Sequence, residues 1–540
     1  MQELTEAWRP YASVAEQQAK RTLPDICIPG VLDCIAGFLS PNDIALGFRL
    51  INKAAAAQFS HYTVLKLSLP SPHAVFIARW CSPGAMRSLT LERRRKFLCL
   101  TAASGSLDNL RAAITAAGIM TYNEVSEAAA AAGQLHICLW LQQEGWLVGD
   151  PMAAAAGRGH REVCEGLLAA GYEATYSAAG AAARGGHAEL MVWLLGLVRP
   201  LPDPEDDRYE RWEVDCEAVW GCDLETLKRL FPNGMPAIPQ MPEADDSEDE
   251  DQFIVEEEWE VLVASRLVNA AASPTPDWQA KVKWVESQGV PRECNWANSE
   301  VVCHPYALER LTWLWQNGYD IGDILLLAET IRAGNTAALE YLLGEVGVPL
   351  DWHQYGVDAA ANRGHLAMLE LLSDRTGIPL VNAPGIEVAN VALSAVRGGH
   401  LAVVAWLVER FGPQAVPLSG KLFRGAAYSG NMELLVWLRE RGCEWDGTAY
   451  VGAAEGGCGQ VLEWLKAGGC PMPVDGSPYE AAASHDDHAT LTWLLEAGVP
   501  VDLEQLVKRV SNPGKPWKQR RQEEMLSWLR EECVRRQGEQ

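Results

Sequence analysis

The sequence predicts an all-α protein built from repeated helix-turn-helix units, and three observations support this fold class. A short frame recurs ten times along the 540 residues: an Ala-rich segment, a Gly, a polar residue and then an apolar segment. Neighbouring copies within a group lie 26 to 35 residues apart, which is the length of one supersecondary unit in a stacked solenoid. The apolar segments follow a helical stripe and not the alternation of a strand.

The frame is clearest in "AAARGGHAELMVWLL", residues 181–195. The Ala-rich part has high helix propensity, and the Gly that ends it suits a left-handed C-cap. The apolar part predicts a second helix that contacts its partner helix and both neighbouring units. Structural repeat positions are therefore assigned to the turn and to the second helix: Gly159, His160, Gly186, His187, Gly364, His365, Gly399, His400, Gly430, Gly457, Trp193, Trp406, Trp437, Trp464 and Trp493.

His187 read alone has the character of a catalytic or metal-binding residue, but its position is not reserved for His. Other copies place Gln134, Asn335, Cys458 or Asp487 there, and the last copy has Asp486 in place of the turn Gly. A position that accepts all these residues is selected for a turn, so the sequence predicts a structural role for His187.

Composition changes along the chain predict seven parts. In chain order they are an N-terminal tail (1–22), a helical module (23–60), a connecting segment (61–95), a first group of repeats (96–198), an acidic, Pro-rich interruption with one degenerate unit (199–260), a second group of repeats (261–500) and a C-terminal capping helix and tail (501–540). Within the interruption, residues 199–210 and 232–253 are predicted to be loops, because they have too little apolar content to pack.

The repeats resemble the ankyrin repeat, whose frame is T-P-L-H-x-A-A-x-x-G-H followed by an apolar helix. Two copies keep register across that frame, "DPMAAAAGRGH" (150–160) and "SPYEAAASHDD" (477–487). The resemblance implies stacked helix pairs and a protein target on the concave side. Loop aromatics are the candidates to bind it: Trp146, Tyr172, Tyr176, Tyr319, Trp352, Tyr355, Trp445, Tyr450 and Tyr479.

The module at 23–60 contains one apolar helix, a "SPND" turn and a second helix that this turn caps. It resembles an F-box, which opens with Leu-Pro, reaches a Phe-Leu, turns at Pro-x-Asp and ends near Arg-Leu-x-Asn; Asp43, Arg49, Ile51 and Asn52 also fit this pattern. The resemblance implies that the module binds a Skp-type adaptor and so a cullin, through Leu23, Pro24, Ile35, Phe38, Leu39, Pro41, Leu46 and Leu50. The alternative is a cap that shields the first repeat, and the two roles are compatible.

The net charge of −26 argues against nucleic acid as a partner, although residues 243–260 alone contribute eleven acidic side chains. The basic run Arg93 to Lys96 is predicted to be an exposed helical face. No signal peptide and no apolar run long enough to span a membrane are present, and the cysteines show no C-x-x-C pair, so an intracellular protein, cytoplasmic or nuclear, with reduced thiols is expected.

Catalytic and phosphate-binding motifs are absent, so no enzyme and no cofactor are expected. The "HDDH" of residues 485–488 has metal-ligand residue types, but it falls at a turn, where these types are common. The sequence therefore predicts a non-enzymatic protein that binds a protein target, as substrate receptor of an F-box/cullin ubiquitin ligase. The alternative is an ankyrin scaffold or regulatory binder without a ligase role.

Overall fold

The computed structural model describes residues 29–119, 123–146, 149–236, 265–290, 300–349, 354–375 and 387–501, with a few isolated positions beyond these ranges. Within this part of the chain every regular element is a helix, and the all-α prediction is confirmed. Thirteen helical pairs follow one another between Leu91 and Ala497, and we refer to them as the array.

The elements before the array are α3 (Pro29–Ala36), α4 (Pro41–Leu46), the 3-10 turn η1 (Phe48–Leu50), α5 (Lys53–Gln58) and α6 (His73–Trp80). The first helices of the pairs are α7 (Leu91–Ala103), α9 (Asn123–Ala131), α11 (Pro151–Ala156), α13 (Tyr176–Arg184), α15 (Pro204–Gly221), a helix over 265–272, the 3-10 turn η2 (Glu300–Cys303), α20 (Ile324–Ala333), α22 (Gln354–Asn362), α24 (Val388–Gly398), α26 (Gly420–Ser429), α28 (Thr448–Glu455) and α30 (Ser477–Ala483).

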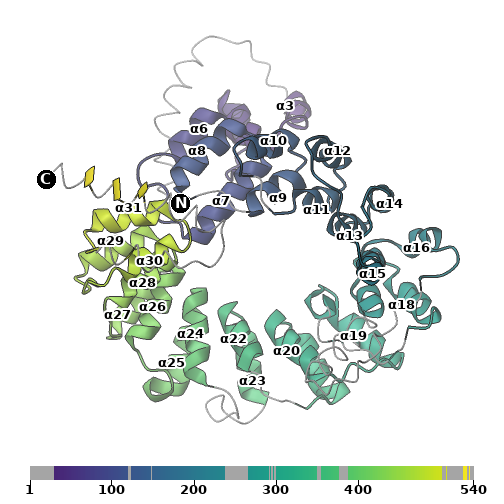
Figure 1. The fold of residues 1–540 in the computed structure, drawn as a ribbon. Helices are drawn as coiled ribbons and strands as arrows, with labels where there is room; N and C mark the ends of the chain where they lie inside the picture. Colours follow the sequence, from purple (N-terminus) through teal and green to yellow (C-terminus); the bar gives the residue numbers. More distant parts are fainter. Residues whose placement is uncertain are drawn as a thin grey trace.

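The second helices are α8 (Leu107–Ala117), α10 (Leu135–Gln143), α12 (Arg161–Ala169), α14 (Ala188–Leu195), α16 (Leu224–Leu230), α18 (Trp278–Ser287), α19 (Ala307–Gln316), α21 (Thr336–Tyr341) with the π-turn η3 (Leu342–Val346), α23 (Leu366–Arg375), α25 (Leu401–Ala415), α27 (Met432–Glu440), α29 (Gly459–Ala467) and α31 (His488–Ala497). Each first helix packs on the first helix of the next pair, while its own second helix lies outside it (Figure 1).

The turn between the two helices of a pair requires a positive φ, which L residues other than Gly rarely adopt. Nine of the ten turn positions are Gly, with φ between 66° and 78°. The tenth is Asp486, at 54°, and it is the one described residue other than Gly with a positive φ. The recurrence of Gly in the sequence is thus explained by backbone geometry.

In several units the residue after the turn Gly bonds to the preceding unit. Nε2 of His160 lies 3.0 Å from the Ala131 carbonyl oxygen, and Nε2 of His400 lies 2.8 Å from that of Asn362. The ring of His187 lies against Gly159, where an added Cβ would come within 3 Å of three ring atoms. These bonds satisfy carbonyl groups at the end of the preceding first helix, which have no partner inside it.

Two units that lack this frame use a buried cation for the same purpose. Nζ of Lys281 donates to the carbonyl oxygens of Val219 and Cys222 at 2.9 and 2.5 Å, at the end of α15. The guanidinium of Arg310 donates to the carbonyl oxygens of Ala271 and Ser273 at the end of the 265–272 helix. The side chain changes, but the helix end is capped from the next unit in both cases.

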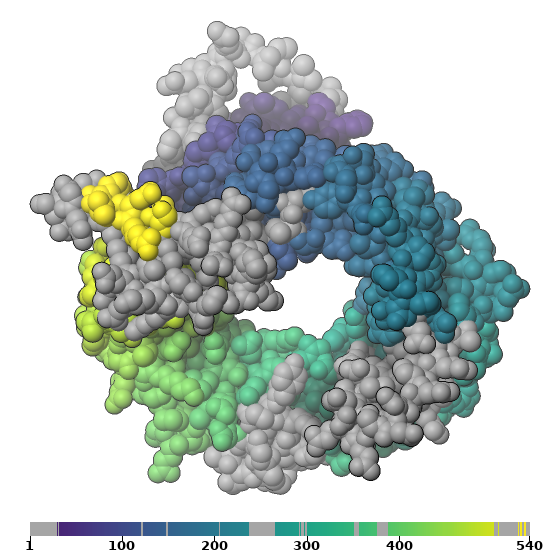
Figure 2. All heavy atoms as spheres, viewed as in Figure 1, coloured from purple at the N-terminus to yellow at the C-terminus, as the bar shows by residue number. Residues whose placement is uncertain are grey.

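The array does not end in two free edges: it closes into a ring with a central opening (Figures 1 and 2). The first helices line the opening, and the helices α7 and α8 at the start of the array lie beside α29, α30 and α31 at its end (Figure 1). We call the contact between residues 87–118 and residues 456–496 the seam.

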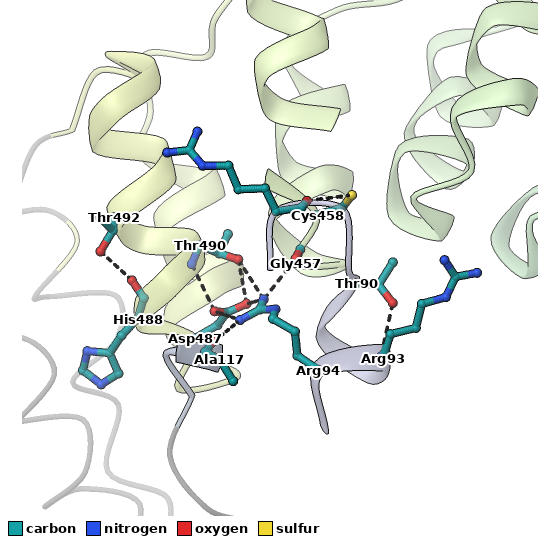
Figure 3. A network of polar contacts seen from close by, with 11 residues as sticks. Thr90, Arg93, Arg94, Ala117, Gly457, Cys458, Asp487, His488, Thr490 and Thr492 are labelled. Carbon is teal, nitrogen blue, oxygen red and sulfur yellow. Dashed lines mark hydrogen bonds and ion pairs between the residues drawn. The ribbon is translucent and has the colours of Figure 1, made fainter. Parts of the chain in front are cut away.

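The centre of the seam is an ion pair with no solvent exposure at either side chain (Figure 3). Nη1 and Nη2 of Arg94 donate to the two carboxylate oxygens of Asp487, at 2.9 and 2.5 Å. The same guanidinium donates to the carbonyl oxygens of Ala117 and Gly457 at 2.7 and 3.0 Å. It also lies 5.0 Å from the centroid of the Trp493 ring. The expectation that Arg93 to Lys96 forms an exposed face is wrong for Arg94. Its side chain is buried, because the Asp487 carboxylate and two carbonyl oxygens accept its hydrogen bonds.

Backbone contacts extend the seam on both sides of this pair. The amide of Leu91 donates to the Gly456 carbonyl at 2.8 Å, that of Gln460 to the Arg87 carbonyl at 2.8 Å, and that of Ala489 to the Gly118 carbonyl at 3.0 Å. The side chain of Arg87 pairs with Glu463 and Glu496. Polar contacts thus lie on both sides of the buried Arg94–Asp487 pair.

The Pro-rich interruption is more ordered at its start than the sequence predicts. Residues 204–210 belong to α15, so the loop prediction for 199–210 is wrong over that part. The hydroxyl of Tyr176 and the amide of Leu201 donate to the carboxylate of Asp207, and the Tyr176 hydroxyl is the main reason that the Asp207 pKa falls to about 2. These bonds to the preceding unit explain how a segment with few apolar residues is held in place. Most of 232–253 lies outside the described residues.

Candidate binding surfaces

The N-terminal module has a small hydrophobic core of its own, formed by Leu32, Ile44, Ala55 and Phe59 and separate from the core of the array. Ser40 caps α4 in a capping box with Asp43. The buried amide of Asn42 donates to the carbonyl oxygens of Lys66, Leu69 and Pro70. The module is thus folded around four short elements and is tied to the segment that follows it.

Four large apolar side chains of the module remain exposed, and we call them the apolar module surface: Ile35, Phe38, Leu50 and Ile51. Phe38 is 87% exposed, which is unusual for a phenylalanine in a folded unit. Exposed apolar groups of this size mark surfaces that bind other proteins. The side chains lie at the end of α3 and at the end of η1.

The structure divides the predicted adaptor-binding residues into three groups. Ile35, Phe38 and Leu50 are exposed, and Leu39, Pro41 and Leu46 are half-buried, with Leu39 packed against the module core. Leu23 and Pro24 lie outside the described residues.

A role of the module as cap of the array finds little support in the packing. Phe76 and Trp80 of α6 cover the start of the array, since both rings lie within 6 Å of the Phe97 ring of α7. The seam covers the remaining edge of α7. A closed ring has no apolar end left for the 23–60 module to shield.

The predicted target-binding aromatics are mostly packed inside the array. Tyr176, Tyr319, Tyr450 and Tyr479 are buried, so the expectation that they form an exposed surface is wrong. The hydroxyl of Tyr479 donates to the Val499 carbonyl at 2.8 Å. These tyrosines sit in the first turn of a first helix or just before one, and their side chains are buried inside the array and not exposed to solvent.

The other predicted aromatics do not form a free surface either. Trp146 stacks edge-on against Trp140, and Trp445 packs against Phe423 and Trp464. Tyr172 is half-buried against the core of the array. Trp352 and the side chain of Tyr355 lie outside the described residues.

Arginines of the first helices form the contacts that cross the inner face of the ring. Arg184 of α13 pairs with Glu217 at 2.9 Å and with Glu300, and it lies 4.2 Å from the centroid of the Trp220 ring. Glu300 belongs to η2, three first elements further on. A side chain that reaches so far indicates that the inner face is strongly concave here.

A second arginine group lies on the opposite arc of the ring. Arg397 of α24 is 3.6 Å from Glu455 of α28, although α26 lies between these helices. Arg424 of α26 is 3.4 Å from the same carboxylate, and Arg397 lies 5.2 Å from the centroid of the Tyr428 ring. The sequence prediction named aromatics alone for the concave side; the signal that it missed is the arginine that recurs before the turn Gly, as at Arg184, Arg363 and Arg397.

His, Cys, Asp and Glu side chains are the candidate metal ligands of the described part of the chain. No group of three or more His, Cys, Asp and Glu side chains that could hold a metal ion occurs there. Within "HDDH", Asp487 is engaged by Arg94, and His488 packs against Trp528. The side chain of His365 lies against Gly334, and burial lowers its pKa.

Comparisons with known proteins give no identification: no family model matches the chain, and no curated protein matches its sequence. Of the helices that the structure describes, none combines the length and the apolar character needed to cross a membrane.

Proposed function

We propose that this chain is a non-enzymatic receptor that joins a protein target to a ubiquitin ligase. The N-terminal module binds a Skp-type adaptor of a cullin complex through the apolar module surface, and the concave side of an ankyrin-type array binds the target. The observation that carries the proposal is a module with its own core and an exposed Phe38, beside a ring that needs no cap.

The proposal is tested with the purified full-length chain, immobilised by a tag, and a purified Skp-type adaptor bound to its cullin. Wild type is compared with Phe38→Asp, which places a carboxylate in the apolar module surface without entering the module core. Val474→Asp is the matched control, because Val474 is also strongly exposed, at 79%, but lies in a loop of the array.

We expect wild type and Val474→Asp to retain the adaptor and Phe38→Asp to lose it. A wild-type chain that fails to retain the adaptor refutes the ligase role. Equal retention by Phe38→Asp refutes the assigned docking surface. Circular dichroism of each variant confirms that the helices are intact.

A further inference from the structure

Three arginines lie on, or directly after, the neighbouring first helices α22, α24 and α26 of a protein whose net charge is −26. Arg363 follows α22 directly, Arg397 lies in the last turn of α24, and Arg424 lies in α26. All three side chains are exposed, those of Arg397 and Arg424 by 55% and 45%. We call these residues the arginine patch.

The arginine patch has more positive charge than its surroundings neutralise. Among the described residues, the carboxylate that pairs with it is Glu455, shared by Arg397 and Arg424. Arg363 donates to the carbonyl oxygen of Arg332 at 3.0 Å, and no ion pair joins it to a carboxylate of the described residues. Three guanidinium groups thus face one carboxylate.

We propose that the arginine patch binds an extended, acidic segment of a polypeptide, an inference that rests on the proposed function and names the chemistry of the target. Carboxylates of the bound segment accept charge-assisted hydrogen bonds from the guanidinium groups. The Tyr428 ring beside Arg397 adds an aromatic contact next to the charged ones, and Arg and Tyr are the residue types that dominate binding at protein interfaces.

The spacing of the helices sets the spacing of the acidic residues. Packed helices lie roughly 8 to 10 Å apart, and an extended polyproline-II segment advances about 3.1 Å per residue and returns every third side chain to the same face. Carboxylates at every third residue therefore match arginines on successive first helices. A nucleic acid is disfavoured, because neutralising a run of phosphates takes more clustered cations than the three guanidinium groups of the arginine patch.

The proposal is tested by fluorescence anisotropy at low salt with the full-length chain and a fluorescein-labelled peptide of four Ser-Ser-Glu repeats. A peptide of four Ser-Ser-Gln repeats is the control probe. The double variant Arg363→Gln/Arg397→Gln is compared with Arg410→Gln/Arg441→Gln, which removes the same charge from α25 and from the end of α27, outside the inner face.

We expect the Glu peptide to bind wild type and the control variant with the same dissociation constant. In Arg363→Gln/Arg397→Gln the constant should rise about tenfold, the effect of losing two exposed but converging ion pairs. Four results overturn the proposal. The Gln peptide binds as tightly as the Glu peptide, or both variants weaken binding equally. Alternatively, an equal concentration of single-stranded DNA displaces the Glu peptide, or the Glu peptide does not bind at millimolar concentration.

The adaptor-retention assay separates this inference from the proposed function. Arg363→Gln/Arg397→Gln should retain the adaptor as wild type does. If wild type retains the adaptor but does not bind the Glu peptide, the inferred target chemistry alone is refuted. If wild type binds the Glu peptide but does not retain the adaptor, the ligase role alone is refuted.

Discussion

The Arg94–Asp487 ion pair is fully buried at the centre of the seam, and replacing Asp487 by Ala tests whether closure of the ring depends on it. The substitution removes the carboxylate that accepts two hydrogen bonds from Arg94 and leaves the guanidinium without solvent access. Three neutral acceptors remain, the carbonyl oxygens of Ala117 and Gly457 and the Thr490 hydroxyl. These dipoles do not balance a buried charge.

The expected cost follows from what the variant leaves behind. Removal of one partner of a buried pair costs about 3 to 5 kcal/mol, because the other charge stays desolvated. Global unfolding of a domain costs about 5 to 15 kcal/mol. Water reaches Arg94 at a lower cost if only the polar seam separates, so we expect local opening of the ring and not loss of the helices.

Hydrogen exchange measures this opening directly. The amides of Leu91 and Gln460 donate across the seam, so their exchange should accelerate in Asp487→Ala, while amides in the middle of α24 keep their protection. Small-angle X-ray scattering should report a larger radius of gyration. The control is Glu165→Ala, which breaks a surface pair with Arg161 that is half-exposed on both sides and is worth at most about 1 kcal/mol.

A double variant separates charge burial from packing. Arg94→Met/Asp487→Leu removes both charges and should recover most of the lost stability, since apolar replacement of a whole buried pair is often neutral. If Asp487→Ala loses less than about 1 kcal/mol and its seam amides exchange at the wild-type rate, the ion pair does not hold the ring closed.

Three further predictions concern individual positions. Gly364→Ala should cost more stability in urea unfolding than Gly442→Ala, because both have φ above 70° but only at Gly364 would a Cβ overlap a His ring; equal costs would contradict the turn-to-turn contact. Tyr479→Phe should lower the unfolding free energy by about 1 kcal/mol, because it removes the hydrogen bond of the hydroxyl. Tyr450→Phe should leave the unfolding free energy unchanged, because the buried Tyr450 hydroxyl contacts no acceptor in the described residues; the reverse order would contradict the assignment. Burial lowers the pKa of Lys281 to about 8, so the unfolded chain holds this proton more tightly than the folded chain does. The unfolding free energy of wild type, compared with that of Lys281→Met, should therefore rise by about 2 kcal/mol between pH 7 and pH 10. Parallel pH profiles of the two proteins would contradict this.

The helical units were predictable because their signals are local. A Gly with positive φ, an Ala-rich helix before it and an apolar helix after it lie within one stretch of about 15 residues, such as 181–195. The same local pattern is the reason that the sequence predicts a turn role for His187, and in the structure its ring lies against Gly159 of the preceding turn.

The seam was not predictable in this way, because Arg94 and Asp487 are 393 positions apart and belong to no shared pattern. One trace of it is present in the sequence. Asp487 occupies the column that holds His, Asn or Gln in most other units, and a carboxylate in a column of carbonyl-binding side chains requires a cation as partner. The frame shows this departure but not where the cation lies.

The exposure of the loop aromatics was predicted wrongly for a different physical reason. Aromatic residues near the start of a first helix are expected to be exposed because they follow turn-rich segments, but Tyr450 and Tyr479 are fully buried inside the array. In an array whose units touch on two sides, position in the loop does not determine exposure. Long arginine side chains, which keep their charge in water, remain accessible on the inner face.

We expect closure of the ring and binding of the proposed peptide to be coupled. Arg397 reaches Glu455 across α26 only because the inner face is strongly curved, and the seam fixes that curvature by joining the two ends of the array. An open array relaxes, which moves the first helices apart and changes the spacing of the arginine patch. Linkage is reciprocal, so if Asp487→Ala weakens binding of the Glu peptide, the bound peptide must slow exchange at Leu91 in wild type. Peptide binding that leaves both quantities unchanged would show that the patch recognises its ligand whether the ring is open or closed.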